Sequence, residues 1–506
     1  MRFTIERLKP IIFIYLLIAE MSLASTASTP ETVTVKSPED LKNLIAQNNY
    51  DIKILYQRAK QAQAIVDGVK GAYYPVLSTD INYSDDQKEP TSNFQPARIK
   101  NEHFGISLLQ RTPIGINGSI GFANDRTELF QSEPPNSMLP YPETYKQPAL
   151  YVNLEVDILE DFLGYISQKQ WDQVELDKEV ADMQISLAQE QLYLTSSSLF
   201  WNLQAMEEMK ILVREIINRL KQLESDTIEK SKRHIANPGD VYKLKASISK
   251  RELDILAIDK NINTLERAIF EMVSASGSKS IKPSKKLSDI QADIIECEDF
   301  ILNQGEEIRP SWSKQFNILE TRIERANLEQ KILNRKTLPD IKLFAKYSQT
   351  GTDADKDDSY TEMLHGERPQ LIVGINLTHE LSPSLGKSAR TLGEVELQHS
   401  KLAYEKFFHE SETLYLHIKE KTTKLKEEDI LVEQAIHYED GQMVDINRRY
   451  KQGRVSLFEL IQEEGSVLQT QLIQKELWAK RIENVYQFLT HFDNLECRNI
   501  TTEVRK

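Results

Sequence analysis

Apolar residues recur at the spacing of packed helices along four long stretches of this chain. These stretches contain neither glycine nor proline, and they run over residues 165–237, 240–276, 394–440 and 466–506. Within the first, apolar residues repeat every seven positions at Leu192, Leu199, Met206, Val213 and Leu220, which is the pattern of helices that pack side by side. A helix of ~65 residues would be roughly 100 Å long. The pattern therefore predicts helices far longer than those of an ordinary compact domain.

Four shorter segments alternate apolar and polar residues with a period of two, and they separate the helical stretches. They cover residues 75–84, 148–158, 339–349 and 369–379. Each is about as long as a membrane-spanning barrel strand, which is apolar on one face and polar on the other. A soluble, half-buried sheet shows the same alternation, so the pattern alone does not distinguish the two.

The order helix, strand, polar loop, strand, long helix, tip, helix occurs twice, which indicates an internal repeat. Pro75 and Pro339 each stand where a helix ends and a strand begins, a position that suits the restricted backbone before proline. The tip over residues 234–241 matches a second tip that begins at Gly453. Each repeat is therefore predicted to hold a long helical hairpin.

This repeat predicts an organisation in five parts. They are a signal peptide over 1–27, a first repeat over 28–276, an equatorial linker over 277–300, a second repeat over 301–492 and a C-terminal tail over 493–506. The first repeat carries an insertion over residues 101–147, between its two strands, that alternates apolar and polar residues again. We predict an extra strand hairpin there, with long exposed loops.

The N-terminus has the layout of a secretory signal. Arg2, Arg7 and Lys9 precede a short apolar core, and small residues follow it, as in a cleaved signal peptide. The alternative is a retained interfacial anchor. Export would place Cys297 and Cys497 in an oxidising compartment, where disulfides form, but nothing in their spacing decides whether they pair.

Composition and motifs argue against several classes of function. A formal net charge of −14 argues against nucleic acid, which needs a basic surface. Gly386-Lys387-Ser388 resembles the end of a phosphate loop, but Leu381 stands where the first glycine of that motif belongs. The two cysteines and nine histidines show no metal-binding spacing. We therefore predict no enzyme, no cofactor and no metal site.

With this layout the chain resembles the TolC-type outer-membrane efflux family over residues 35–492. The resemblance rests on the duplicated order, on Pro75 and Pro339, on Arg309-Pro310 at the start of the second repeat and on the two tips. It implies a mainly α fold with a transmembrane β-barrel. In the family, three identical protomers each give four strands to one barrel of twelve, and their helical hairpins form a periplasmic α-barrel. The extra hairpin either joins that barrel or decorates one end.

The resemblance also implies a function and partners. The chain would be a passive duct for efflux or type I secretion in the outer membrane of a Gram-negative bacterium. Its partners would be two further copies of the chain, outer-membrane lipid, a periplasmic membrane-fusion adaptor and an inner-membrane pump of RND or ABC type. The alternative is a periplasmic coiled-coil scaffold whose alternating segments form a soluble sheet.

Candidate site residues follow from the same resemblance, and all of them lie at the tips, 234–241 and 450–462. The adaptor-contact residues would be Asn237, Pro238, Gly239, Gly453, Val455 and Ser456. A link between the hairpins that gates the duct falls on Asp240, Tyr450 and Arg454. The periplasmic constriction falls on Glu459 and Gln462, and three copies of the glutamate around one axis would favour cations.

Several of these residues have a plainer structural interpretation as well. Asp240 suits the start of a helix, as a cap or a first-turn acid. Tyr450 can simply pack at the hairpin junction, and Glu459 can be a solvated helix residue. Gly239 and Gly453 can serve the turning of the chain rather than contact with a partner.

Overall fold

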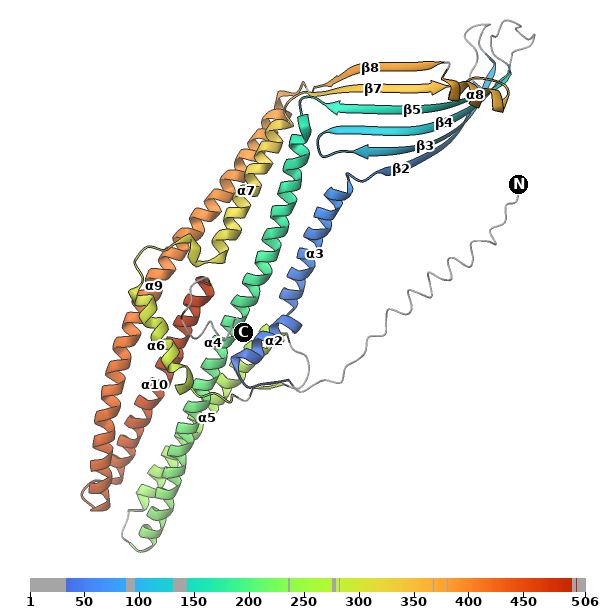
Figure 1. Ribbon diagram of the computed structural model, residues 1–506. Helices are drawn as coiled ribbons and strands as arrows, with labels where there is room; N and C mark the ends of the chain where they lie inside the picture. The colour runs from blue at the N-terminus through green and yellow to red at the C-terminus, as the bar shows by residue number, and fades with distance from the viewer. Residues whose placement is uncertain are drawn as a thin grey trace, which may run out of the picture.

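The structure is a computed structural model that describes residues 33–87, 96–130, 143–234, 237–274, 279–281, 283–366, 368–379, 381–493 and 497. The predicted signal peptide lies outside the described residues, as does most of the predicted C-terminal tail. The molecule is elongated. Figure 1 shows a sheet at one end, two helical hairpins that reach the opposite end, and shorter helices about midway.

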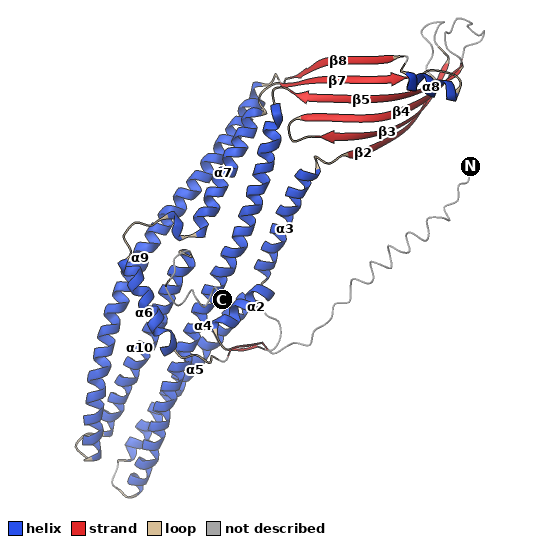
Figure 2. Ribbon diagram, viewed as in Figure 1, coloured by secondary structure: helices blue, strands red, loops and turns tan. Residues whose placement is uncertain are grey.

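Four helices form a layer that begins directly below the sheet. They are α3 (Tyr50–Gly71), α4 (Tyr165–Lys232), α7 (Lys314–Arg335) and α9 (Pro383–Lys451). In this layer α3 packs against α4, α4 against α7, and α7 against α9. Each of the four helices adjoins a strand of the sheet in the chain, so the helical and the β part follow one another directly (Figure 2).

Two of these helices fold back as hairpins. α4 is followed by α5 (Pro238–Val273), and α9 is followed by α10 (Leu457–His491). Because α10 packs against α4 as well as α9, the two hairpins form one bundle. Its buried core consists of Val213, Ile216, Ile217, Leu220, Leu244, Ile248, Ile258, Ile262, Leu457 and Leu468. Val213 and Leu220 belong to the seven-residue repeat that predicted helix packing.

Shorter elements surround the middle of the bundle. β1 (Val33–Val35) pairs in parallel with β6 (Lys279–Ile281). α2 (Pro38–Asn48) packs against α4 and α5, while α6 (Ser288–Asn303) packs against α9 and α10. The short η3 (Pro310–Trp312) leads into α7. The predicted linker over 277–300 thus holds β6 and most of α6.

The sheet at the other end is an antiparallel meander of six strands in the order β2-β3-β4-β5-β7-β8. The strands are β2 (Val76–Asp86), β3 (Arg98–Arg111), β4 (Ile116–Phe130), β5 (Thr144–Asp157), β7 (Asp340–Thr350) and β8 (Pro369–Thr378). The predicted insertion over 101–147 holds most of β3, all of β4 and the start of β5, and its hairpin lies inside the sheet. One chain therefore holds six strands in a single sheet, two more than the four that the resemblance implies for each protomer. A hairpin can be inserted between two neighbouring strands of a meander without reversing either of them, because it adds two antiparallel strands.

One face of the sheet is apolar across all six strands. The register places the apolar residues of neighbouring strands opposite one another. The exposed members include Leu77, Ile81, Ile106, Leu108, Ile120, Val152, Leu154, Leu343, Tyr347, Leu371, Val373, Ile375 and Leu377. Ile81 is 80% exposed and Leu371 is 67% exposed, so most of this face has no cover within one chain. α8 (Lys356–His365) connects β7 and β8 at the end of these strands that is far from the long helices. Its Tyr360 stacks on Phe122 of β4, with ring centroids 6.2 Å apart.

None of the helices in the described part of the chain combines the length and the apolar composition that crossing a bilayer requires.

Candidate functional site

The structure brings the two predicted tips to the same end of the molecule, opposite the sheet (Figure 1). The first tip connects the end of α4 at Lys232 to the start of α5 at Pro238. The second connects the end of α9 at Lys451 to the start of α10 at Leu457. Residues 235 and 236 of the first tip lie outside the described residues.

In the first tip, the candidate residues also build the start of α5. The side chain of Asn237 accepts a hydrogen bond from the backbone nitrogen of Gly239 at 2.9 Å, and Pro238 is the first helical residue. Asp240 lies in the first turn, and its Oδ1 is 3.3 Å from Nζ of Lys243. Asn237, Pro238 and Gly239 are exposed, so a partner could reach them.

In the second tip, the candidate residues end one helix and start the next. Gly453 has a positive φ of 71°, a conformation that favours glycine, and its nitrogen donates to the Tyr450 carbonyl at 2.9 Å. The nitrogen of Arg454 donates to the Arg449 carbonyl, also at 2.9 Å. Ser456 is the N-cap of α10. Val455, between them, is half-buried, while Arg454 and Ser456 are exposed.

Tyr450 lies where the two hairpins meet. Its ring packs against the apolar core of the bundle, and Nζ of Lys230 is 6.0 Å from the ring centroid. Burial raises the pKa of Tyr450, a hydrogen bond with Thr227 opposes the rise, and the Asp240 carboxylate adds to it. The hydrogen-bond partner of the Tyr450 hydroxyl is thus Thr227 of α4, and a gating link through Asp240 and Tyr450 stays a prediction.

Glu459 and Gln462 lie on the first turns of α10 and are exposed. The Glu459 carboxylate accepts from the Ser456 nitrogen at 3.1 Å, and the Glu459 nitrogen donates to the Ser456 hydroxyl at 3.2 Å. This reciprocal pair is a capping box, so Glu459 has a structural role within one chain. Its position on a constriction shared by several chains stays a prediction.

Sequence reasoning missed a buried carboxylate near this tip. Glu464 of α10 is 8% exposed, and its Oε2 is buried with no hydrogen-bond partner among the described residues. Burial raises the pKa of Glu464, and the Arg219 guanidinium of α4 opposes the rise. The signal was present in the sequence, because Glu464 follows Leu457 and Leu460 at helical spacing and so falls on the apolar stripe of α10.

A second unpredicted feature is a buried ion cluster midway along the bundle. Arg481 of α10 is 2% exposed and Glu298 of α6 is 1% exposed. The guanidinium donates to both Glu298 oxygens, at 2.9 Å and 2.5 Å, and also to Asp429 of α9. The same guanidinium lies 3.9 Å from the centroid of the Trp478 ring. This cluster holds α6 against the second hairpin.

The cysteine pairing that the sequence left open is present in the structure. Cys297 of α6 and Cys497 form a disulfide whose Cα atoms are 5.0 Å apart and whose residues are 200 apart in the chain. Both residues are buried in the main apolar core. The disulfide ties the described end of the C-terminal segment to the same helix that carries Glu298.

The polar face of the sheet carries charged side chains in contact across strands. The two ring nitrogens of His103 lie 2.5 Å from Asp80 Oδ2 and 2.7 Å from Asp125 Oδ1, which connects β2, β3 and β4. Nearer the helices, Nζ of Lys342 on β7 lies 3.6 Å from Oε1 of Glu155 on β5. The sheet therefore separates an uncovered apolar surface from a charged one.

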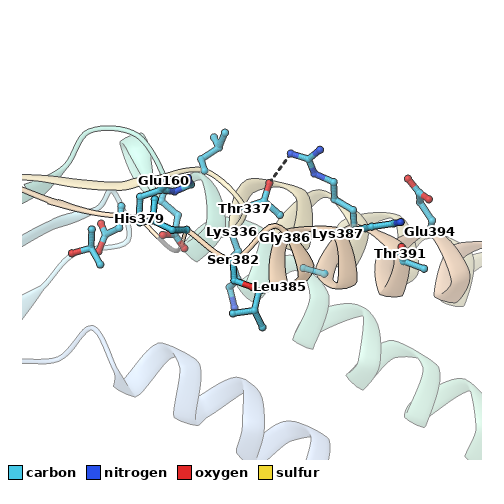
Figure 3. A pocket seen from close by; sticks show the side chains of 16 residues that line it. Glu160, Lys336, Thr337, His379, Ser382, Leu385, Gly386, Lys387, Thr391 and Glu394 are labelled. Atoms are coloured by element: carbon cyan, nitrogen blue, oxygen red, sulfur yellow. Dashed lines mark hydrogen bonds between the residues drawn. The ribbon is translucent and has the colours of Figure 1, made fainter.

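A pocket lies where β7 and β8 meet α7 and α9. Figure 3 shows Lys336, Thr337, Gly386 and Lys387 among the residues that line it. Nη2 of Arg390 donates to Oγ1 of Thr337 at 3.1 Å, which bridges α9 and the end of α7. The stretch that resembled a phosphate loop is therefore the first turns of α9, not a loop that could surround a phosphate.

Comparison of the sequence with models of protein families gives no match, and comparison with curated proteins gives none either. Solved structures do match over most of their length. CusC, whose structures concern transmembrane channel formation, has a TM-score of 0.63 at 12% identity, covering 92% of this chain and 95% of that chain. The outer membrane protein VceC from Vibrio cholerae has a TM-score of 0.60 at 13% identity, covering 89% and 95%. The open MtrE outer membrane channel of Neisseria gonorrhoeae gives 0.61 at 11%, covering 90% and 89%.

These matches confirm, at the level of the fold, the resemblance that the sequence predicts. The chain has the fold of TolC-type outer-membrane channels. At such low identity the similarity shows the fold alone, so it assigns no role to an individual tip residue.

Proposed function

We propose that this chain is one protomer of a homotrimeric channel-tunnel in the outer membrane of a Gram-negative cell, a passive duct for efflux or type I secretion. The observation that carries the proposal is the sheet, which is apolar on one face across six strands and has β2 and β8 at its two edges. Open sheet edges are not tolerated in hydrocarbon. Pairing β2 of one copy with β8 of the next closes the sheet and leaves the apolar face to lipid.

The rest of the fold supports a duct. The polar face of the sheet, with His103 and Lys342, would line the lumen, and the layer of α3, α4, α7 and α9 would continue the wall as an α-barrel in the periplasm. A passive duct needs energy from elsewhere. It would come from an inner-membrane pump of RND or ABC type, joined to the duct by a periplasmic membrane-fusion adaptor.

The two tips are the proposed periplasmic mouth. The exposed residues Asn237, Pro238, Gly239, Gly453 and Ser456 would offer the adaptor a surface at the end of each hairpin, together with the half-buried Val455. Asp240, Tyr450 and Arg454 would link the hairpins in the closed state. Glu459 and Gln462 would line the narrowest point, where repeated carboxylates favour cations.

Three measurements on the mature protein test the proposal together. Carbonate and sarkosyl extraction should leave the protein with the outer membrane, and the detergent-corrected mass should be that of three chains. In planar bilayers the trimer should give a small, cation-selective conductance. A soluble monomer without conductance would contradict the channel and would favour the periplasmic scaffold.

A further inference from the structure

The exposed apolar residues on one face of the sheet form a band, here called the apolar belt. This belt is continuous across β3 and β4, the two strands of the inserted hairpin. One line of paired residues crosses the whole sheet, one from each strand, and every member of it is apolar and exposed. Its members are Leu77, Leu108, Ile120, Val152, Tyr347 and Leu371. β3 and β4 thus present the same kind of residue on the same face as the four strands that flank them.

The belt is also inclined in the way that a barrel requires. Leu77 and Leu371 are the two ends of that line of paired residues. On β2 the apolar positions run from Leu77 to Tyr83, away from the helices. On β8 they run from Leu371 to Leu377, toward the helices. Between these strands, over five strand-to-strand steps, the centre of the belt therefore shifts by about six residues. At ~3.3 Å per residue and ~4.8 Å per strand, this is a slant of about 40°. Barrel strands tilt by about 35–45°.

The turn between β3 and β4 packs closely against the segment that connects β5 to α4. A Cβ atom on Gly164 would lie 1.7 Å from the carbonyl oxygen of Pro113, and one on Gly115 would lie 2.5 Å from that of Asp161. The backbone nitrogen of Asp157 donates to the Gly115 carbonyl at 3.3 Å. The turn between β3 and β4 is therefore seated on the joint between β5 and α4, which includes η2 (Phe162–Gly164).

Six strands also match the width of the helical layer below them. Strands ~4.8 Å apart and inclined by ~40° occupy about 38 Å of circumference for six strands, but only about 25 Å for four. Four neighbouring helices occupy about 32–40 Å at their usual spacing of 8–10 Å. With six strands, the wall keeps nearly the same circumference where it passes from helices to sheet.

We propose that β3 and β4 are part of the lipid-facing wall of the channel, so that three copies of the six-stranded sheet close a barrel of eighteen strands. This inference rests on the proposed trimeric channel. Because barrel diameter grows roughly linearly with strand number, such a barrel is about one and a half times as wide as one of twelve strands. The membrane part then admits bulkier solutes, and the tips rather than the barrel limit the size of the cargo.

Tryptophan quenching by brominated phospholipids tests where the hairpin lies. Three variants are reconstituted in vesicles: Ile120→Trp on the apolar face of β4, Ser119→Trp on its polar face, and Val373→Trp on β8. The native tryptophans lie in helices and in η3, so the wild type gives the background. We expect Ile120→Trp to lose as much of its added fluorescence as Val373→Trp, while Ser119→Trp is protected. Each variant must keep the wild-type mass in detergent.

The outcomes separate this inference from the proposed function. If Val373→Trp is quenched and Ile120→Trp is not, the channel stands but the hairpin lies outside its wall. If both are quenched and the mass is that of two chains, the barrel has twelve strands and the inference is wrong. If neither is quenched, the sheet does not face lipid and the proposed function fails. Quenching of both variants in a trimer supports the barrel of eighteen strands.

Discussion

The two repeats agree in their helices and differ in their strands. α3 and α7 have 22 residues each, α4 has 68 and α9 has 69, and α5 has 36 and α10 has 35. The first repeat nevertheless gives the sheet four strands and the second gives two. Helix length is constrained because both hairpins pack along each other and end at the same depth. Strand number is not, because a hairpin can be added to a meander without moving its neighbours.

The repeats differ again in how their second hairpin helices are buried. When the two tips are aligned, Arg481 and Glu464 of α10 correspond to Ile262 and Lys245 of α5. Ile262 is buried as an ordinary apolar residue and Lys245 is exposed. α10 thus buries charge where α5 does not. Arg481 is buried beside Glu298 because α6 packs against α10, whereas the charge that acts on Glu464 is the Arg219 guanidinium of α4. Equivalent positions of a repeat therefore acquire different chemistry from their neighbours.

Removing the buried guanidinium of Arg481 should lower the free energy of unfolding more than any other change predicted here. Arg481→Met leaves the Glu298 carboxylate buried without its partner, which should lower the free energy of unfolding by about 3–5 kcal/mol. Denaturant unfolding followed by circular dichroism measures the change. Lys480→Met is the matched control: it removes an exposed partner of Glu476 and should cost less than about 1 kcal/mol. Equal losses in the two variants would show that the cluster does not hold α6 in place.

The joints between strand and helix offer a matched pair of glycines, one in each repeat. Gly164 has a φ of 73° and touches the turn of the inserted hairpin, so Gly164→Ala should lower the free energy of unfolding by about 1–3 kcal/mol. Gly386 lies in the first turns of α9, where an added Cβ meets only Thr337 at 3.8 Å. Gly386→Ala should be neutral or stabilise by up to about 1 kcal/mol. Thermal unfolding of both variants measures the difference. Similar effects would mean that the hairpin turn is not fixed to its joint.

The buried carboxylate of α10 should make stability depend on pH. Because the pKa of Glu464 is raised in the folded state, its contribution is fully present below the unfolded pKa, near 4.5, and is lost as pH rises through the folded value. Glu464→Gln should therefore reduce the fall in stability above pH ~4.5 and stabilise the protein by on the order of 1 kcal/mol at pH 7.

Unfolding midpoints across a pH series measure this dependence. Glu463→Gln, which removes a half-buried carboxylate from the same turn, should leave it in place. If both variants keep the wild-type pH profile, another group causes the dependence.

A smaller effect is expected where the hairpins meet at Tyr450. Tyr450→Phe removes the hydroxyl that bonds Thr227 and should cost about 0.5–1.5 kcal/mol. If this contact helps to hold the mouth closed, the variant should also raise the single-channel conductance in planar bilayers. Tyr438→Phe, at a tyrosine of the same helix that is 71% exposed, should change neither quantity. An unchanged conductance for Tyr450→Phe would support a packing role alone.

The smallest effect on stability should come from the first-turn acids, which occupy equivalent positions in the two tips. Glu459→Ala removes half of a capping box and Asp240→Ala removes a first-turn acid paired with Lys243, so each should cost about 0.3–1.5 kcal/mol. Reversal potentials in a salt gradient distinguish them. We expect only Glu459→Ala to weaken cation selectivity, and equal selectivity in both variants would place Glu459 away from the constriction.

Much of the fold could be predicted from local pattern. The absence of glycine and proline over 165–237 and 394–440 indicated α4 and α9, and Pro75 and Pro339 stand directly before β2 and β7. The alternation of Leu371, Val373 and Ile375 indicated the apolar face of β8. These features could be predicted because helix length, strand boundaries and strand faces depend on residues that are close together in the chain.

The place of the inserted hairpin could not be predicted in the same way. Ile116 and Ile120 alternate with polar residues whether or not their strand pairs with β5, so the pattern is equally compatible with a hairpin inside or outside the sheet. The tips were found, but their candidate roles depend on neighbouring chains. The partner of the Tyr450 hydroxyl, Thr227, lies on the other hairpin, and no spacing in the sequence indicates it.

The sequence by itself determined the duplicated order of elements, the lengths of the helices and the two faces of the strands, because each follows from backbone restriction and from the period of apolar residues. Only the tertiary structure decided which distant residues meet. The Cys297–Cys497 disulfide joins residues 200 apart and the Arg481–Glu298 pair joins residues 183 apart. Such contacts arise from the packing of α6, α9 and α10 around one core. Packing between distant segments does not produce a periodic pattern in the sequence.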